Sequence, residues 1–236
     1  MEPRDIKRLI YLGIFIIFTI FGAFNGFKGK RIAKNNGFDN IKEYNEYKRQ
    51  EEKEKEIIFY TNGTIKEDGY LLTSLKDKGL KPEINISNSY NYTLPAQIAF
   101  LDTEKRNVID VNIYHDYFSV AVEGEGKSVE EINEKMKETL MLAQKTVSSY
   151  SKKDIVIISP NYITDDEDEI DKNNGDYSYE DFINAVIKGC EENNIDYINL
   201  YEYTKNNPIK IKDEVNVYDE KIQKYLFEKI MNIVQK

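Results

Sequence analysis

The sequence has few of the residues that usually build metal sites, disulfides and nucleophilic catalytic sites. It contains one cysteine, one histidine and no tryptophan among 236 residues. The single cysteine, Cys190, excludes an intrachain disulfide, and on the apolar side of a predicted helix it is expected to be a buried, inert thiol. A nucleophile needs a base, and His115 is the only histidine that could serve. No Walker, dinucleotide-binding, zinc or aspartyl-dyad signature is present, so we predict no cofactor.

Positive charge is scarce beyond the N-terminal region. The chain has 33 Lys and Arg against 42 Asp and Glu, a net charge of -9. Seven basic and two acidic residues fall within residues 1–34, which leaves 26 basic and 40 acidic residues in the rest. Such an acidic domain repels phosphate backbones, which argues against a nucleic-acid partner. The basic residues near the N-terminus instead lie where they would meet lipid head groups.

Charge is absent altogether from residues 9–27, where Ile, Phe, Leu and Gly dominate. Nineteen helical residues at about 1.5 Å each reach roughly 28 Å, close to the thickness of the hydrocarbon layer. The segment is not followed by the small-x-small pattern of a signal-peptide cleavage site. We therefore predict a retained single-pass transmembrane helix, with the lipid bilayer as its partner.

The orientation of this helix follows from its short N-terminal tail. Basic residues flank the span on both sides, so the positive-inside rule gives no clear answer. A very short tail before a first hydrophobic segment usually stays cytoplasmic, and we expect the soluble domain outside the cytoplasm, at the cell envelope. The predicted layout is a tail at 1–8, the span at 9–27, a polar juxtamembrane stalk at 28–55 and a soluble domain at 56–236.

The stalk is polar and prone to helix formation over residues 39–56. Glu51 and Lys55 form a favourable i,i+4 pair. The apolar positions are too sparse for the sustained heptads of a coiled coil. We expect a solvated helical stalk.

From residue 56 onward, segments typical of strands and helices alternate. The strands are expected at 57–60, 83–87, 108–113, 154–160 and 197–201. The helices are expected at 69–78, 95–103, 128–149, 178–190 and 218–236. This order predicts an α/β fold, a three-layer sandwich with a mostly parallel five-stranded sheet. The alternation at 108–113 and 118–122 also fits an antiparallel hairpin, which would make the domain an α+β interaction module.

The order of elements over residues 56–236 resembles the SGNH (GDSL-type) hydrolase fold. The run Ile155-Val156-Ile157-Ile158-Ser159-Pro160 is similar to the family's fourth strand, and Tyr197-Ile198-Asn199-Leu200-Tyr201 to its fifth. Asp213-Glu214-Val215-Asn216 lies where the family has its Asp-x-x-His block. Ile58-Phe59-Tyr60-Thr61-Asn62-Gly63 lies where the first strand leads into Gly-Asp-Ser, and Ile113-Tyr114-His115-Asp116 lies near the Gly-x-Asn-Asp block.

The chain departs from the family at both catalytic positions that matter most. Gly63 would occupy the position of the nucleophile, and Asn216 that of the base. Without serine and histidine there is no activated nucleophile. The resemblance therefore implies a degenerate SGNH-like fold whose role is binding or assembly, with an envelope glycan or another membrane protein as partner. The alternative is an active esterase or acyltransferase with a non-standard site, for which Thr64, His115 and Asp213 are the candidate catalytic residues.

A dense acidic stretch at 165–181 offers the only candidate cation ligands. Asp166, Asp168 and Asp171 supply oxygen donors at the close spacing that suits Ca²⁺. The order of ligands in an EF-hand is not matched, because Gly175 falls at the fifth place counted from Asp171. A solvated loop is the simpler interpretation of this charge run, and we predict no metal site.

Overall fold

The computed structural model describes residues 28–61, 63–86, 94–102, 104–111, 128–147, 155–162, 177–207 and 217–235. The chain divides into two compact units, Met1–Lys53 and Glu54–Lys236. The predicted span at 9–27 lies outside the described residues. Within residues 28–235 as described, no helix combines the length and the apolar character needed to cross a bilayer.

The described part of the first unit, from residue 28 onward, contains two helical segments joined by a tight turn. A helix at 28–35 ends where the amide of Phe38 donates to the carbonyl of Ala33 at 3.0 Å and Gly37 takes a φ of +82°. This is a Schellman-type stop, which favours glycine because an L side chain is strained at positive φ. The side chain of Asn40 then accepts from the amide of Glu43 at 2.9 Å and so caps α2 (Ile41–Glu54). The helix predicted within 39–56 is thus present as α2.

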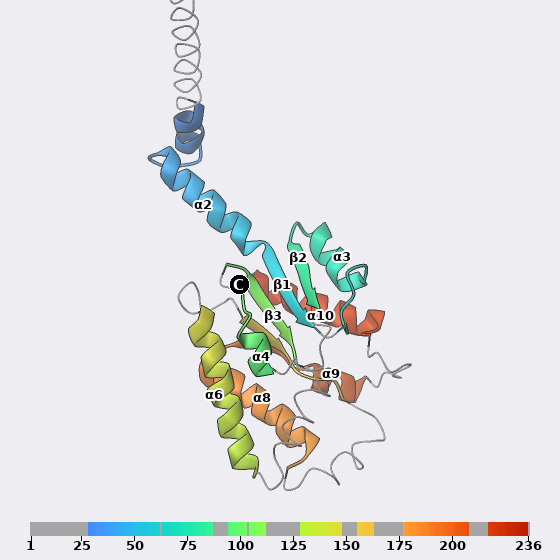
Figure 1. Cartoon of the computed structure of the whole chain (residues 1–236). Coiled ribbons are helices and arrows are strands. Elements are labelled where there is room, and N and C mark those ends of the chain that lie inside the picture. The colour runs from blue at the N-terminus through green and yellow to red at the C-terminus, as the bar shows by residue number, and fades with distance from the viewer. Residues whose placement is uncertain are drawn as a thin grey trace, which may run out of the picture. The chain divides into compact units, whose positions relative to one another are not determined.

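The second unit is built on one parallel sheet (Figure 1). Its strands lie in the order β2-β1-β3-β4-β5, and every neighbouring pair is parallel. Their bounds are β1 (Glu56–Thr61), β2 (Lys81–Ile86), β3 (Arg106–Asp110), β4 (Ile155–Ile158) and β5 (Asp196–Ile198). The predicted α/β class and the parallel five-stranded sheet are confirmed. The antiparallel hairpin that was the alternative spans 108–122. Its residues 108–110 belong to the parallel strand β3, and residues 112–122 lie outside the described residues.

Helices cover both faces of this sheet. They are α3 (Tyr70–Asp77), α4 (Leu94–Ile98), α6 (Val129–Val147), α8 (Tyr179–Asn193), α9 (Leu200–Asn206) and α10 (Glu220–Val234). The predicted start signals are present: Ser128 with Glu131 and Ser178 with Asp181 form reciprocal capping boxes ahead of α6 and α8.

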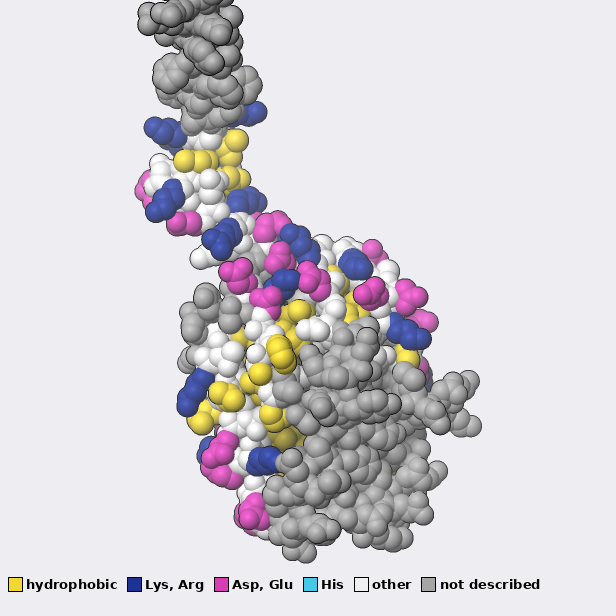
Figure 2. Space-filling model, viewed as in Figure 1, with side chains coloured by type: hydrophobic (Ala, Val, Ile, Leu, Met, Phe, Trp, Pro, Cys, Tyr) yellow, Lys and Arg dark blue, Asp and Glu magenta, His cyan; other side chains and the backbone are white. Residues whose placement is uncertain are grey.

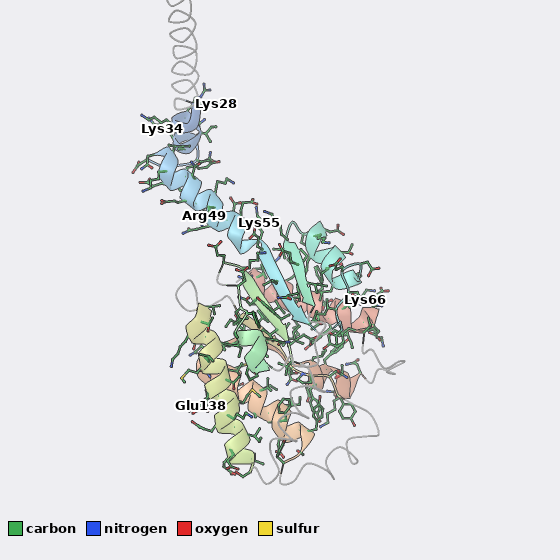
Figure 3. The ribbon with its side chains drawn as sticks, viewed as in Figure 1. Lys28, Lys34, Arg49, Lys55, Lys66 and Glu138 are labelled. Atoms are coloured by element: carbon green, nitrogen blue, oxygen red, sulfur yellow. The ribbon has the colours of Figure 1, made fainter. Side chains whose placement is uncertain are left out.

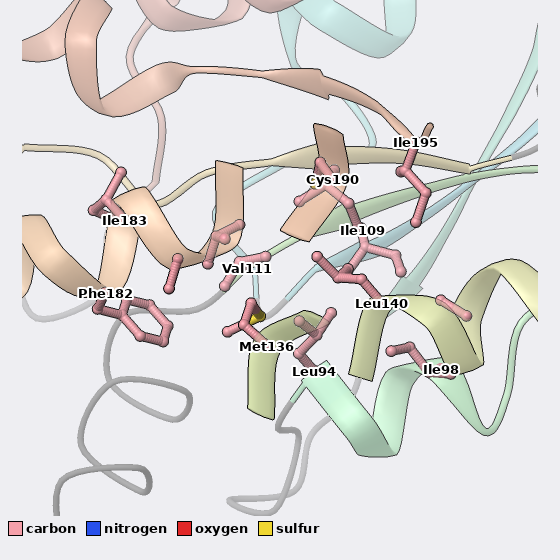
Figure 4. Packing of buried hydrophobic residues seen from close by; sticks show 14 of the residues in the cluster. Leu94, Ile98, Ile109, Val111, Met136, Leu140, Phe182, Ile183, Cys190 and Ile195 are labelled. Carbon is pink, nitrogen blue, oxygen red and sulfur yellow. The ribbon is translucent and has the colours of Figure 1, made fainter. Parts of the chain in front are cut away.

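Successive side chains of each strand enter opposite cores. In β1, Phe59 packs into a core closed by α3 and α10, whereas Tyr60 packs into the core beneath α4, α6 and α8. β4 divides in the same way, and all four of its residues are buried. Figure 4 shows the second core, where Leu94, Met136 and Leu140 from α4 and α6 meet Ile109 from the sheet. The domain is a three-layer sandwich, as predicted.

The fifth strand is shorter than predicted. The expectation of a strand over 197–201 is wrong at its end, because β5 stops at Ile198 and α9 begins at Leu200. The side chain of Asn199 accepts from the amide of Glu202 at 3.0 Å, which caps the new helix. A capping side chain within an apolar run therefore overrode the pattern of a strand.

Candidate functional site

Polar side chains meet at the carboxyl ends of β1 and β3, the edge where parallel sheets bind ligands. Thr61 ends β1 and Asp110 ends β3, and the register of these neighbouring strands places the two ends side by side. Thr64 follows one turn after β1, and Tyr218 precedes α10. All four side chains are buried, with exposed fractions from 0% for Thr61 to 8% for Thr64.

Hydrogen bonds link these four residues, which we call the Asp110 cluster (Thr61, Thr64, Asp110 and Tyr218). The phenol of Tyr218 donates to Oδ1 of Asp110 at 2.7 Å, and the hydroxyl of Thr64 donates to Oδ2. The hydroxyls of Thr61 and Thr64 lie 2.6 Å apart, and Thr61 Oγ1 lies 3.3 Å from Asp110 Oδ2. One proton order satisfies the shortest contacts: Thr61 donates to Thr64, Thr64 to Asp110 and Tyr218 to Asp110. Both carboxylate oxygens thus have partners within the protein.

Backbone contacts fix the cluster in place. The amide of Tyr218 donates to the carbonyl of Thr64 at 2.9 Å. Gln223 of α10 donates from its side-chain amide to the carbonyl of Tyr218 at 2.7 Å and accepts from the amide of Leu71 at 3.1 Å. The cluster therefore ties β1, β3 and the starts of α3 and α10 together.

The electrostatic environment of Asp110 is unusual for a carboxylate. Burial raises the pKa of its carboxyl from 3.8 to about 6, and hydrogen bonds from Thr64, Tyr218 and Thr61 oppose this shift. Burial, with the neighbouring Asp110 charge, raises the pKa of the Tyr218 phenol well above 10.0. Tyr218 is thus a proton donor at any physiological pH, while the raised pKa of about 6 means that Asp110 changes its charge in weakly acidic solution.

The turn between β1 and Thr64 has a glycine where the backbone requires one. Gly63 has a φ of +100°, and no atom of the described residues lies within 4 Å of the position that a Cβ would take. Whatever the space, an L residue is strained at this φ. The position that the resemblance assigns to the nucleophile is therefore built for a residue without a side chain.

Comparison with known proteins bears on the fold of the second unit. No protein-family model matches the sequence, and no curated protein matches it. Among solved structures, the acetyl xylan esterase AlAXEase is 19% identical with a TM-score of 0.52, over 75% of this chain and 98% of that one. A structure described as a GDSL-like lipase from Parabacteroides merdae is 15% identical with a TM-score of 0.50, over 76% of this chain and 95% of that one. The domain has an SGNH-like fold. At these identities the likeness concerns the fold alone.

Of the three candidate catalytic residues in the SGNH-like domain, the structure describes only Thr64. Its hydroxyl contacts Asp110, a residue that the sequence analysis did not select. His115 and Asp213 lie outside the described residues, as does Asn216. The candidate cation ligands Asp166, Asp168 and Asp171 also lie outside them. Elsewhere in the described ranges, no group of three His, Cys, Asp or Glu side chains is arranged to hold a metal ion.

Ser159, directly after β4 at the same edge, serves the backbone. It is 1% exposed, and its Oγ accepts from the amides of Leu200 and Tyr201 at 2.9 and 3.2 Å. These are amides at the start of α9, which have no partner within the helix. Ser159 thus fixes the start of α9 and is not available as a nucleophile.

A small apolar pocket lies among α4, α6 and α8, away from the residues of the Asp110 cluster. Its lining includes Leu94, Met136 and Phe182, with Lys135 and Thr139 as its polar members. Its free volume, measured for the centre of a water-sized sphere, is about 30 Å³, which is room for a few water molecules. The pocket as it stands does not hold a molecule of substrate size.

Cys190 is buried and its thiol pKa is raised by that burial, as expected of an inert thiol.

The residues that the sequence analysis missed are Thr61, Asp110 and Tyr218. One signal pointed to Asp110: it is a charged residue within the apolar run Val108-Ile109-Asp110-Val111. Aspartate is almost never fully buried unless it is paired. A buried strand that contains an aspartate therefore predicts partners, but only the fold reveals that they come from β1 and from the lead-in to α10.

Proposed function

We propose that this chain is a single-pass, membrane-tethered SGNH-like domain that binds a ligand or partner at the cell envelope without hydrolysing it. The observation that carries the proposal is the Asp110 cluster. At the edge of the sheet where a substrate would bind, the described polar groups are buried and hydrogen-bonded to one another. Groups engaged in this way stabilise the fold.

The chemistry of acyl transfer supports this interpretation. A hydroxyl nucleophile must reach the carbonyl carbon of the substrate while a base takes its proton. Gly63 has no hydroxyl. The hydroxyl of Thr64 is held by Asp110 on a side chain that is only 8% exposed. With no such nucleophile among the described residues of this edge, the proposed role is binding at the edge of the sheet without hydrolysis.

Ester hydrolysis by the purified full chain tests the absence of catalysis. With p-nitrophenyl acetate and a longer acyl ester, we expect rates equal to those of the buffer with heat-denatured protein. Turnover above that background that disappears in Thr64→Val would contradict the proposal. Tyr225→Phe is a suitable control variant, because within the described residues the phenol of Tyr225 makes one hydrogen bond, a 3.4 Å contact with the carbonyl of Asn199, outside the Asp110 cluster.

The proposed membrane tether is based on the uncharged run of residues 9–27, which is long enough to cross a bilayer as a helix. Alkaline carbonate extraction of membranes tests it directly. The full chain is expected to stay in the pellet, and a chain that begins at residue 28 is expected to leave it. Protease added to intact cells tests the proposed extracytoplasmic side, where the domain should be cleaved without lysis.

The second candidate function is an esterase or acyltransferase with a non-standard site. It is favoured by one observation, the contact between the Thr64 hydroxyl and a carboxyl whose pKa burial raises to about 6. A base with a pKa near the working pH is suited to proton transfer. If the enzyme exists, Asp110→Asn should abolish its activity while the domain stays folded, and the rate should rise through pH 6 as Asp110 ionises.

The ligand class that we would test first is an envelope glycan. One structurally similar protein is named as an acetyl xylan esterase, and its substrate by that name is an acylated polysaccharide. Calorimetry with soluble cell-wall polysaccharide tests this class. The second class is another membrane protein, tested by cross-linking in intact membranes. If neither the polysaccharide nor a membrane protein binds, the proposed binding role is without support.

A further inference from the structure

The first unit contains a charged surface that the SGNH-like fold does not use. Four basic residues lie on the helix at 28–35, and all four are exposed: Lys28, Lys30, Arg31 and Lys34. We call residues 28–38 the basic elbow. It contains no Asp or Glu, whereas residues 39–56 contain seven acidic and five basic residues. Positive charge is thus concentrated in the segment that directly follows the proposed span.

The fold of the elbow orients these charges. Ala33 is fully buried, and a Cβ on Gly29 would lie 3.2 Å from the side chain of Ile41 in α2. Gly29 and Ala33 are four residues apart, so they share one face of the helix, and that face packs inward. At about 100° per residue, Arg31 lies on the side of the helix opposite this face. Lys28, Lys30 and Lys34 lie to either side of Arg31. Figure 3 shows Lys28 and Lys34 extending away from the ribbon.

The charges of the elbow are not neutralised by the described parts of the protein. None of the four basic side chains makes an ion pair with a described residue, whereas farther along α2 Lys42 pairs with Glu46 and Lys48 with Glu51. In Figure 2, dark-blue side chains surround the segment just beyond the grey N-terminal part. The basic elbow therefore offers a positive surface to an external anion.

Apolar and aromatic side chains accompany the charge. Ile32 is 39% exposed on the same helix. The ring of Phe38 contacts those of Tyr44 and Tyr47 at centroid distances of 5.6 and 5.0 Å, and Tyr47 is 48% exposed. Tyrosine and basic residues next to a hydrophobic span are typical of the region of lipid head groups. A soluble polyanion offers no apolar layer to receive Ile32.

We propose that the basic elbow binds the phosphate groups of anionic phospholipids in the membrane that holds the chain. The inference rests on the proposed tether, which places residue 28 at the bilayer surface. Each basic residue near an anionic surface contributes about a fivefold gain in binding, and four together give on the order of several-hundredfold at low salt. The effect weakens as salt screens the charges.

Native mass spectrometry of the full chain tests the proposal. The chain is placed in vesicles of equal phosphatidylglycerol and phosphatidylcholine and extracted in a mild detergent, and the lipids that stay bound are counted. We expect phosphatidylglycerol to exceed phosphatidylcholine at least tenfold on the wild type. The ratio should fall to near one in the variant Lys28→Gln/Lys30→Gln/Arg31→Gln/Lys34→Gln.

A matched variant removes the same number of charges from exposed lysines of the second unit: Lys76→Gln, Lys78→Gln, Lys188→Gln and Lys221→Gln. It should keep the wild-type ratio. An equal preference in all three proteins would overturn the proposal. So would an unchanged lipid ratio in the elbow variant combined with a loss of polyphosphate binding, because the surface would then serve a soluble polyanion. Carbonate extraction of the same membranes reports the tether separately, so a failed tether and a failed elbow give different results.

Discussion

Tyr218 and Asp110, 108 positions apart in the sequence, are joined by a hydrogen bond of 2.7 Å in the interior of the domain. The bond links the carboxyl end of a central strand to the residue that leads into the last helix. It occupies the edge of the sheet where a ligand would otherwise meet polar side chains.

Tyr218→Phe removes the phenolic hydroxyl, so Oδ1 of the buried Asp110 carboxylate loses its hydrogen bond from Tyr218. An unsatisfied buried acceptor costs about 1–3 kcal/mol, so the free energy of unfolding should fall by that amount. Urea denaturation followed by circular dichroism measures it. The control is Tyr225→Phe, which keeps the 3.8 Å ring stack with Tyr203 and loses only a 3.4 Å contact. Equal losses in the two variants would show that the bond to Asp110 has no special weight.

The pH dependence of stability should carry the signature of Asp110. Burial raises its folded-state pKa to about 6, above the ordinary value of 3.8, so the folded state holds the proton more tightly than the unfolded state. The stability that this carboxyl contributes is therefore complete below about pH 4 and is lost as the pH rises through about 6. A difference of about two pKa units corresponds to about 3 kcal/mol.

Asp110→Asn removes this titration while keeping a polar side chain of the same shape. Relative to the wild type, the variant should gain stability between about pH 4 and pH 8. Unfolding free energies of both proteins at several pH values across this range measure the gain. A difference between the two proteins that stays constant with pH would mean that Asp110 does not titrate in the folded domain.

Gly63→Ser returns a serine to the position that the family uses for its nucleophile. Because the φ there is +100°, an L residue should cost about 1–2 kcal/mol of stability. We expect a lower unfolding free energy and no gain in ester hydrolysis. If the variant were as stable as the wild type, the turn would not require glycine. If it hydrolysed esters, the remaining residues at this edge would still be competent for catalysis.

Ser159→Ala tests the role of the serine that follows β4. Two amides at the start of α9 lose their acceptor, which should cost about 1–3 kcal/mol. Ser74→Ala, on a half-buried serine of α3, should change the stability by less than about 0.5 kcal/mol. Thermal unfolding of the two variants beside the wild type shows the difference. Similar effects would remove Ser159 from this structural role.

Much of the architecture was predictable because local chemistry agreed with the global fold. The apolar runs of β1 and β4 marked buried strands, and Ser128 and Ser178 marked the starts of two helices. The end of β5 was not predicted from its apolar run. Asn199 is a local capping residue within that run, and the second acceptor at the start of α9, Ser159, follows the neighbouring strand β4. The Asp110 cluster was not predicted because its members are far apart in the sequence, at positions 61, 64, 110 and 218. Only the parallel register of the folded sheet brings them together.

Reaction of the full chain with a fluorophosphonate probe, read as intact mass, tests the central claim most directly. Such a probe attaches covalently to a hydroxyl that is activated for attack on an acyl or phosphoryl centre. If the Asp110 cluster only stabilises the fold, the mass stays that of the unmodified chain in the wild type and in Thr64→Val alike. A single added probe on the wild type that Thr64→Val abolishes and Tyr225→Phe retains would contradict the account.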